Sequence, residues 1–257
     1  MTIPWTPINF LRTDGSAPIV LICEHASNNF PEDFSGLGLD EAARMSHAAW
    51  DIGALAVAST LSESLDAPLV SCGVSRMLYD CNRPLSAPDC IPAKSELIAV
   101  PGNEDLSAAQ RNLRYRLIHE PFHLAASGLI AAQQAKLRGP VAIVTIHSFT
   151  PVYYGKPRDV EIGFLHHGNA ELSIAAHGIE REKGRYRAEL NEPYDAADGV
   201  TYSLCKHADV NRLHSTMVEI RNDLVDTEAK AIEVGEHLAE TLRQAVAEVL
   251  PTGENAR

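Results

Sequence analysis

Short apolar runs rich in β-branched residues alternate along this chain with longer stretches of helical periodicity, and this alternation constrains the fold most strongly. The apolar runs predict strands at residues 18–23, 68–72, 141–146, 161–165, 186–190 and 216–220. The clearest predicted helices cover residues 48–65, 107–137 and 226–250. The pattern predicts an α/β fold in which helices cover both faces of a mixed, largely parallel sheet.

The chain shows no internal boundary. Its 257 residues contain no long linker rich in proline, glycine and serine, and no repeat, so we expect one domain over residues 1–257. Residues 86–106 carry three prolines and little periodicity, which predicts a long loop of the kind that often binds ligands. Residues 166–202 are a second candidate lid, with Gly184 and Gly199 as its flexible points.

Net charge and cysteine content indicate which partners and which cellular compartment to expect. The 22 Lys and Arg against 34 Asp and Glu give a net charge of −12, which argues against nucleic acid or an anionic membrane as a partner. The sequence has no apolar run long enough to cross a membrane and does not begin like a signal peptide. Five cysteines without a closely spaced CxxC pair favour a reducing compartment. We therefore expect a cytoplasmic protein, and its oligomeric state stays open.

Two predicted strands end in histidine, in the segments VLICEHAS and AIVTIHSFTP. Ligands of α/β sheets bind outside the carboxyl ends of the strands, so His25 and His147 are the first candidates for a functional site. Two neutral imidazoles suit Zn²⁺, which then needs one or two oxygen ligands to complete its coordination. The alternative is a pair of structural histidines that are hydrogen-bonded at the sheet edge.

The segment HAAWDIGALA offers a third metal ligand. His47 and Asp51 lie at i and i+4 on one predicted helical face, and Asp51 stands among apolar residues, where a free carboxylate is costly to bury. Asp51 is therefore the preferred ligand, although it could instead interact with the dipole at a helix start. Glu24 is the competing oxygen donor, but alternation along the strand turns it away from the side of His25.

A dense polar set follows the second predicted strand, in the segment SRMLYDCNRP. It comprises Arg76, Asp80, Asn82 and Arg83. A guanidinium beside an amide can hold a carboxylate through two parallel hydrogen bonds, so these residues are candidates for substrate binding. The alternative is a structural turn in which Asp80 is a cap and pairs with Arg83.

The segment HSTMVEIRNDL places a carboxylate inside an apolar strand. A buried Glu219 near a metal ion would take a proton from water and pass it to the leaving nitrogen, which makes it the candidate general base. Arg221 shares its side of the strand and is a further candidate for substrate binding. The alternative is a plain ion pair between Glu219 and Arg221.

Together these segments resemble the N-formylglutamate amidohydrolase family, whose members remove a formyl group from the amino group of glutamate. The matching motifs, spread over residues 18–245, are His25-Ala26-Ser27, WDIGAL, YDCNRP, EPFH ending in His123, TIHSFTP, LNEPY and VEIRNDL. The resemblance implies an amidohydrolase that cleaves the N-acyl group, first of all the formyl group, from an acidic amino acid. It also implies similarity to the zinc carboxypeptidases, in fold and in the use of one Zn²⁺ ion.

The resemblance implies roles for several of these residues: His25 and His147 as metal ligands, Glu219 as the general base, and Asn82 with Arg83 as holders of the substrate carboxylate. The sequence departs from the His-x-x-Glu ligand pair of zinc carboxypeptidases, because Asn28 stands at the position of that glutamate. Asp51 fits the gap. The residues kept as alternative ligands or supports are Glu24, Asp80 and His123.

Two other interpretations stay open. A metal-free amidase would use Cys81 or Ser148 as its nucleophile and His147 as the base, with Arg76 and Arg83 lowering the pKa of the Cys81 thiol. A non-catalytic binding protein would hold an acidic amino acid between its arginines and would have no use for a buried carboxylate beside them. Removal of metal would distinguish a metal-free amidase from a metal-dependent one. Replacement of Glu219 would distinguish a binding protein from an enzyme.

Overall fold

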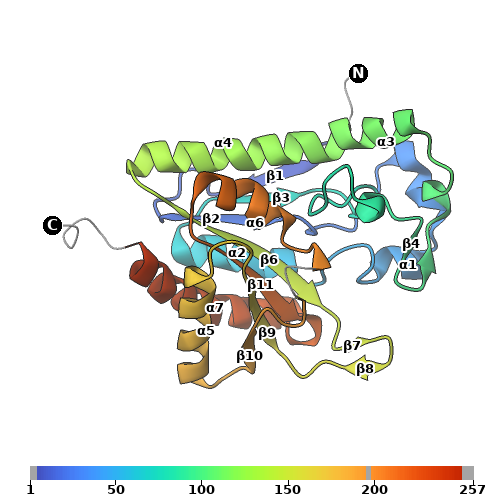
Figure 1. The fold of residues 1–257 in the computed structure, drawn as a ribbon. Coiled ribbons are helices and arrows are strands. Elements are labelled where there is room, and N and C mark those ends of the chain that lie inside the picture. The colour runs from blue at the N-terminus through green and yellow to red at the C-terminus, as the bar shows by residue number, and fades with distance from the viewer. Residues whose placement is uncertain (1–4, 195–197, 251–257) are drawn as a thin grey trace.

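A seven-stranded sheet runs through the centre of the computed structural model, which describes residues 5–194 and 198–250 (Figure 1). The strands, in their order across the sheet, are β1 (Ile8–Leu11), β3 (Leu69–Cys72), β2 (Ile19–Cys23), β6 (Ala142–Phe149), β11 (Ser215–Arg221), β9 (Ile162–Leu165) and β10 (Ala188–Leu190). The pairs from β3 to β11 are parallel, as is β9 with β10, whereas β1 and β9 join antiparallel to β3 and β11. The predicted α/β fold with a mixed, largely parallel sheet is confirmed.

Helices cover both faces of this sheet, as Figure 1 shows. On one face lie α2 (Ala54–Leu65), α5 (Glu171–Lys183) and α7 (Glu228–Val249), whose apolar residues form one core with the sheet. On the other face lie α3 (Ala108–Arg114), α4 (Glu120–Leu137) and α6 (Tyr202–His207). Because helices cover both faces, every residue of the central strands β2 and β6 is buried.

Short elements complete the chain between the sheet strands. These are α1 (Glu41–Met45) and two hairpins, β4 (Lys94–Ser95) with β5 (Ile98–Ala99) and β7 (Val152–Tyr153) with β8 (Lys156–Pro157). The β4–β5 hairpin lies within the predicted loop at 86–106. Among the described residues no helix combines the length and the apolar character needed to cross a membrane.

The structure differs from the sequence prediction at two helices. The helix predicted over 48–65 begins only at Ala54, because the residue before it, Gly53, has a left-handed φ of 80°. Glycine is required at this position, since a Cβ there would lie 2.2 Å from the Val225 carbonyl oxygen. The helix predicted over 107–137 is interrupted by a wider π turn at Tyr115–His119 between α3 and α4. Asp51 therefore lies in the turn before α2 rather than on the helix.

The expectation of a lid over 166–202 is wrong for most of that range. Helix α5 buries Leu172 and Ala176 in the core, and strand β10 joins the sheet, so these elements cannot swing over a site. Gly184 has a left-handed φ of 64° because it ends α5, not because it is a hinge. Strand β1 was not predicted, because it has only four residues and they are partly exposed, so it shows no hydrophobic pattern.

Candidate active site

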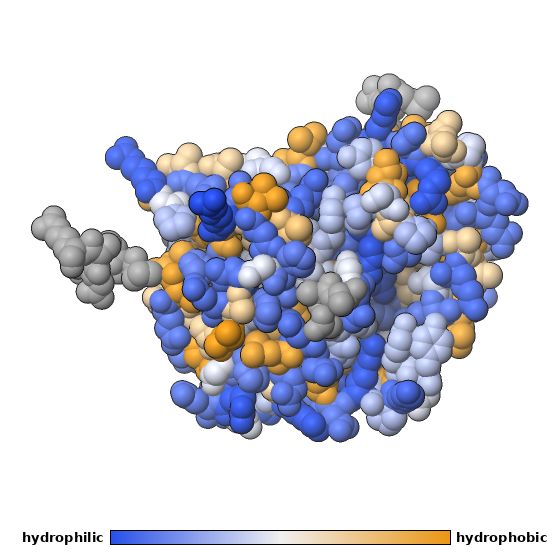
Figure 2. Space-filling view, in the orientation of Figure 1, coloured by the Kyte–Doolittle hydropathy of each residue, from blue (hydrophilic) through white to orange (hydrophobic). Residues whose placement is uncertain are grey.

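A cavity of about 290 Å³ opens beyond the carboxyl ends of β2, β6 and β11. In Figure 2 this side of the molecule is hollowed to the right of centre, where mainly hydrophilic residues line the depression. The cavity lining includes His25, Asp51, His147 and Glu219, which come from segments far apart in the chain. Parallel strands that end at one edge bring them together, as expected for an α/β sheet.

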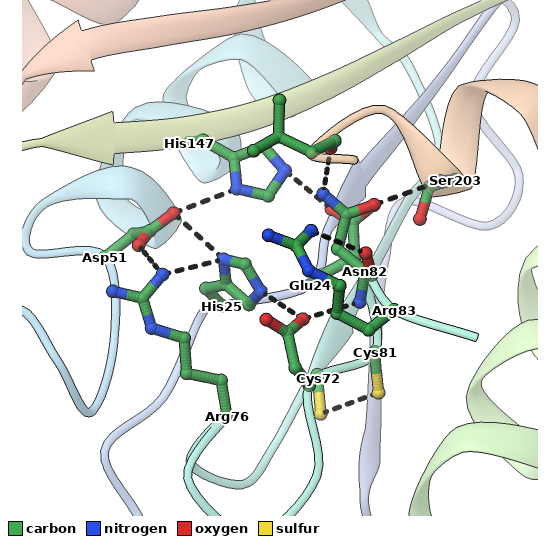
Figure 3. A network of polar contacts seen from close by, with 12 residues as sticks. Glu24, His25, Asp51, Cys72, Arg76, Cys81, Asn82, Arg83, His147 and Ser203 are labelled. Atoms are coloured by element: carbon green, nitrogen blue, oxygen red, sulfur yellow. Dashed lines mark hydrogen bonds and ion pairs between the residues drawn. The ribbon is translucent and has the colours of Figure 1, made fainter. Parts of the chain in front are cut away.

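His25 follows the end of β2, whereas His147 lies within β6, which extends three residues beyond its predicted end. Both imidazoles point a ring nitrogen toward Asp51, which lies to one side of them (Figure 3). Oδ2 of Asp51 lies 3.3 Å from Nδ1 of His25 and 2.9 Å from Nδ1 of His147. The three side chains are buried, and one ligand atom from each lies within 4.8 Å of the other two. This is a group of three residues that could hold a metal ion.

Each of these histidines presents its other ring nitrogen to a second carboxylate. Nε2 of His25 lies 2.7 Å from Oδ1 of Asp80. Nε2 of His147 lies 3.1 Å from Oε2 of Glu24, which Figure 3 labels. A carboxylate behind the imidazole is the usual arrangement around a metal-binding histidine, because it holds the proton on the outer nitrogen and the lone pair on the inner one. Asp80 and Glu24 thus lie behind the two imidazoles and outside the group of three.

The position of Glu24 corrects the expectation that it turns away from the site. Strand β2 ends at Cys23, so the alternation of side chains does not extend to Glu24 and His25. The Glu24 side chain is fully buried, and His147 is its nearest charged partner. Burial by itself would raise the pKa of Glu24, but the His147 imidazole outweighs it and keeps the pKa below its ordinary value.

Arg76 lies directly beside the three-residue group. Its guanidinium is 3.0 Å from Oδ1 of Asp51 and 3.2 Å from Nδ1 of His25, and it also donates a 3.1 Å hydrogen bond to the Ala48 carbonyl. Burial alone would raise the pKa of Asp51, but Arg76 and the two imidazoles hold it well below its ordinary value. Arg76 therefore keeps Asp51 ionised and fixed in place.

His47, four residues before Asp51, stays uncharged. Its Nδ1 lies 3.7 Å from Oδ1 of Asp51. Burial, together with the nearby charge of Arg76, lowers the pKa of His47 to about 3. His47 lines the cavity but adds no positive charge to its wall.

Glu219 lies on β11 directly opposite His147 on β6. Its carboxylate is buried, and Oε2 has no hydrogen-bond partner among the described residues. Burial raises the pKa of Glu219 to about 7, against the opposing effect of His147. A carboxylate with this pKa, facing a cavity, can both accept and release a proton near neutral pH.

Asn82 and Arg83 hold a neighbouring chain segment instead of facing the cavity with all their polar groups. The Asn82 amide donates to the Val200 carbonyl and accepts a 3.0 Å hydrogen bond from the Ser203 amide. The Arg83 guanidinium donates to the Gly199 carbonyl at 2.8 Å. These bonds fasten residues 199–203 beside the cavity, which Arg83 still lines.

Two further predicted residues lie away from the cavity. Arg221 pairs with Asp223 at 2.8 Å and with Glu161 at 3.4 Å, and it is not part of the cavity lining. His123 lies behind the site loop, where its ring nitrogens contact the Cys81 carbonyl and His207, each at 2.8 Å. His123 is thus in a position to support the loop that carries Asp80 and Asn82.

The environment of Cys81 reverses the expectation that neighbouring arginines activate it. The side chain is buried and lies 3.9 Å from the Cys72 sulfur. Burial raises the pKa of Cys81 well above its ordinary value, so its reactive thiolate is disfavoured. The Ser148 hydroxyl donates a 2.8 Å hydrogen bond to the Ile52 carbonyl. Neither group is arranged as an activated nucleophile.

Some cavity residues were missed by sequence reasoning. Lys94 and Glu96 reach the cavity from the region of the β4–β5 hairpin, Tyr153 from the β7–β8 hairpin, and Tyr194 from the segment after β10. The loop predicted over 86–106 does line the cavity, and its role in binding a ligand stays a prediction. For the tyrosines the sequence has no local signal, because hairpins reach a site only through the tertiary fold.

A polar cavity at the carboxyl edge of an α/β sheet, lined by buried imidazoles and carboxylates with shifted pKa values, is typical of a hydrolytic enzyme. Residues 17–225 match the family model for N-formylglutamate amidohydrolase. The chain therefore belongs to the N-formylglutamate amidohydrolase family, and it is a hydrolase that acts on amide bonds.

Two solved structures are similar over nearly the whole chain. A gene product from Agrobacterium tumefaciens is 41% identical, with a TM-score of 0.92, and the match covers 95% of this chain and 96% of that one. The N-formylglutamate amidohydrolase from Ralstonia eutropha is 18% identical, with a TM-score of 0.70, over 94% of this chain and 100% of that one. The likeness to the Ralstonia eutropha structure is one of fold alone. No curated protein sequence gives a significant match.

Proposed function

We propose that this enzyme is a metal-dependent amidohydrolase that cleaves the N-acyl amide of an acidic amino acid, with N-formylglutamate as its substrate. The observation that carries the proposal is the pairing of each inner histidine with an outer carboxylate, His25 with Asp80 and His147 with Glu24. Such pairing orients an imidazole for a metal ion. Membership of the family supports the choice of substrate.

The donor set fits Zn²⁺. His25, His147 and Asp51 supply two nitrogens and one oxygen, a combination found at catalytic zinc sites that keep one position open. Burial alone would lower the pKa of both histidines, but the surrounding carboxylates outweigh it and raise the pKa of each. The same negative field attracts a metal cation, whose binding must displace those protons.

Glu219 is the residue that moves the proton in this mechanism. When bound, the Zn²⁺ ion supplies an activated water molecule and polarises the acyl carbonyl. Glu219 accepts the proton of the attacking water, since its pKa of about 7 suits this step at neutral pH. The C–N bond then breaks, and Glu219 returns the proton to the departing amino group.

Cations on the cavity wall bind the carboxylates of the substrate. Arg83 and Lys94 both line the cavity, and neither is among the residues that surround Asp51. Of the arginines considered from the sequence, Arg76 holds Asp51 and Arg221 pairs outside the cavity. Arg83 and Lys94 therefore account best for a preference for acidic substrates.

The enzyme's setting is part of the proposal. It acts in the cytoplasm on a small molecule, without nucleic acid or membrane as a partner. All five cysteines are free thiols, which suits a reducing compartment.

Removal of metal tests the proposal directly. After dialysis against a chelator, hydrolysis of N-formyl-L-glutamate is expected to fall at least about 100-fold, because the carbonyl and the water lose their activating cation. Added Zn²⁺ restores the rate. The measurement is amine release, with the N-acetyl compound and N-formyl-leucine beside the first substrate. Full activity in the metal-free protein would overturn the proposal and favour a nucleophilic side chain.

Replacement of Glu24 by glutamine tests the support of His147. The change Glu24→Gln removes the negative charge beside Nε2, and we expect about 10- to 100-fold weaker zinc binding at this site. Competition with a chromogenic chelator measures the affinity. Glu171→Gln is the matched control, because Glu171 also pairs with a histidine, His214 at 3.2 Å, outside the cavity. Equal zinc affinities of the two variants would contradict the proposal that Glu24 supports His147 as a metal ligand.

A further inference from the structure

A second cluster of metal-binding side chains lies outside the cavity, on the surface between the β9–α5 loop and α6. It consists of His167, Cys205 and Asp209, and a ligand atom from each lies within 4.8 Å of the other two. None of the three lines the active-site cavity. The cluster plays no part in the proposed hydrolysis.

The fold holds these side chains together from two segments. Cys205 on α6 and Asp209 in the following 3₁₀ turn are four residues apart, and His167 comes from the loop after β9. Oδ2 of Asp209 contacts Nδ1 of His167 and accepts a 3.2 Å hydrogen bond from the Gly168 amide. A Cβ at Gly168 would lie 2.9 Å from the Asp209 carboxyl carbon, so glycine permits this close approach.

The chemistry of the cluster is that of a zinc site. A thiolate, an imidazole and a carboxylate are the three ligand types that Zn²⁺ uses, and the thiolate excludes a preference for Mg²⁺ or Ca²⁺. The side chains of His167 and Asp209 are 42% and 20% exposed, so an ion from solution can reach them and keep a water molecule as its fourth ligand. A half-exposed His–Asp pair adds little stability by itself.

We propose that His167, Cys205 and Asp209 bind a divalent transition-metal ion of the zinc class at a site separate from the active site. The bound ion ties α6 to the β9–α5 loop. The first turn of α6 includes Ser203, which belongs to the segment 199–203 that Asn82 and Arg83 fasten beside the cavity. The ion therefore acts as a structural clamp behind one wall of the active site.

Cobalt substitution tests this site without reference to activity. Co²⁺ replaces Zn²⁺ in such sites, and a thiolate ligand adds a charge-transfer band in the near ultraviolet that nitrogen and oxygen ligands do not give. The active-site group contains no sulfur, and the other four cysteines are buried. Titration of the metal-free full-length protein with Co²⁺ should therefore produce the band from Cys205 alone.

The variants decide the outcome. We expect the band to disappear in Cys205→Ser, which should bind one equivalent of metal fewer than the wild type, and to weaken in His167→Gln. His166→Gln is the matched control, because it changes the adjacent histidine of the same loop and should keep the band. His147→Ala should keep it too, because that change affects only the active site. No band in the wild type, or an unchanged band in Cys205→Ser, would overturn the proposal.

Discussion

Replacement of Glu219 by glutamine is expected to lower kcat/KM for N-formyl-L-glutamate about 1,000-fold. The amide keeps the size of the side chain but cannot accept the proton of the attacking water or return it to the amino group. Glu219 is buried at the cavity, opposite His147 in the sheet register, and its Oε2 has no hydrogen-bond partner among the described residues. The proposed role of general base accounts for this position.

The same variant should fold at least as stably as the wild type. Burial raises the pKa of Glu219 to about 7, which means that the protein destabilises the charged carboxylate, and a neutral amide avoids this cost. We expect an unchanged or higher melting temperature by thermal denaturation. A loss of activity together with a lower melting temperature would point to a structural role instead.

Glu180→Gln provides the control for a buried glutamate. Glu180 is fully buried but lies between α5 and α7, where it contacts His237 at 2.8 Å. We expect this variant to lose stability, because a charged hydrogen-bond network is broken, and to keep its kcat. If both glutamine variants lost activity equally, the assignment of Glu219 as the general base would fail.

Replacement of His147 by alanine is expected to abolish one equivalent of bound metal and to lower kcat/KM at least about 1,000-fold. The imidazole is the link between two carboxylates, with Asp51 at 2.9 Å on one nitrogen and Glu24 at 3.1 Å on the other. Without it, these buried negative charges lose their common partner and the metal loses a nitrogen ligand. Elemental analysis beside the wild type measures the metal.

His237→Ala is the matched control for this change. His237 also pairs with a buried carboxylate, Glu180, but this pair lies between α5 and α7 and outside the cavity lining. It should keep the full metal content and activity. Wild-type metal content in His147→Ala would contradict the proposed ligand set and leave the two histidines as a structural pair.

Much of the fold was predictable from the sequence because its signals are local. An apolar run such as Ile19–Cys23 forms a buried strand wherever it stands in such a chain, and the carboxyl end of a parallel strand is a known place for a site. His25, His147 and Glu219 could therefore be selected as candidates. Their convergence at one cavity edge follows from the strand order.

The contacts of the neighbouring polar residues were not predictable in the same way. Glu24 turns toward His147 because β2 ends one residue earlier, and Asp51 lies in a turn because Gly53 delays the start of α2. Arg221 pairs with Glu161, a residue 60 positions away in the chain. Each of these outcomes depends on where a strand stops or on a partner from a distant segment.

The sequence by itself determined the α/β class, six of the seven sheet strands and a histidine near the carboxyl end of two of them, since hydrophobic periodicity acts within a few residues. Only the tertiary structure decided which carboxylate stands behind each imidazole, which arginine holds Asp51, and that Asn82 fastens a loop. It also brought His167 to Cys205 and Asp209. Such pairings are set by the packing of distant segments, because buried charges must find partners that no local pattern specifies.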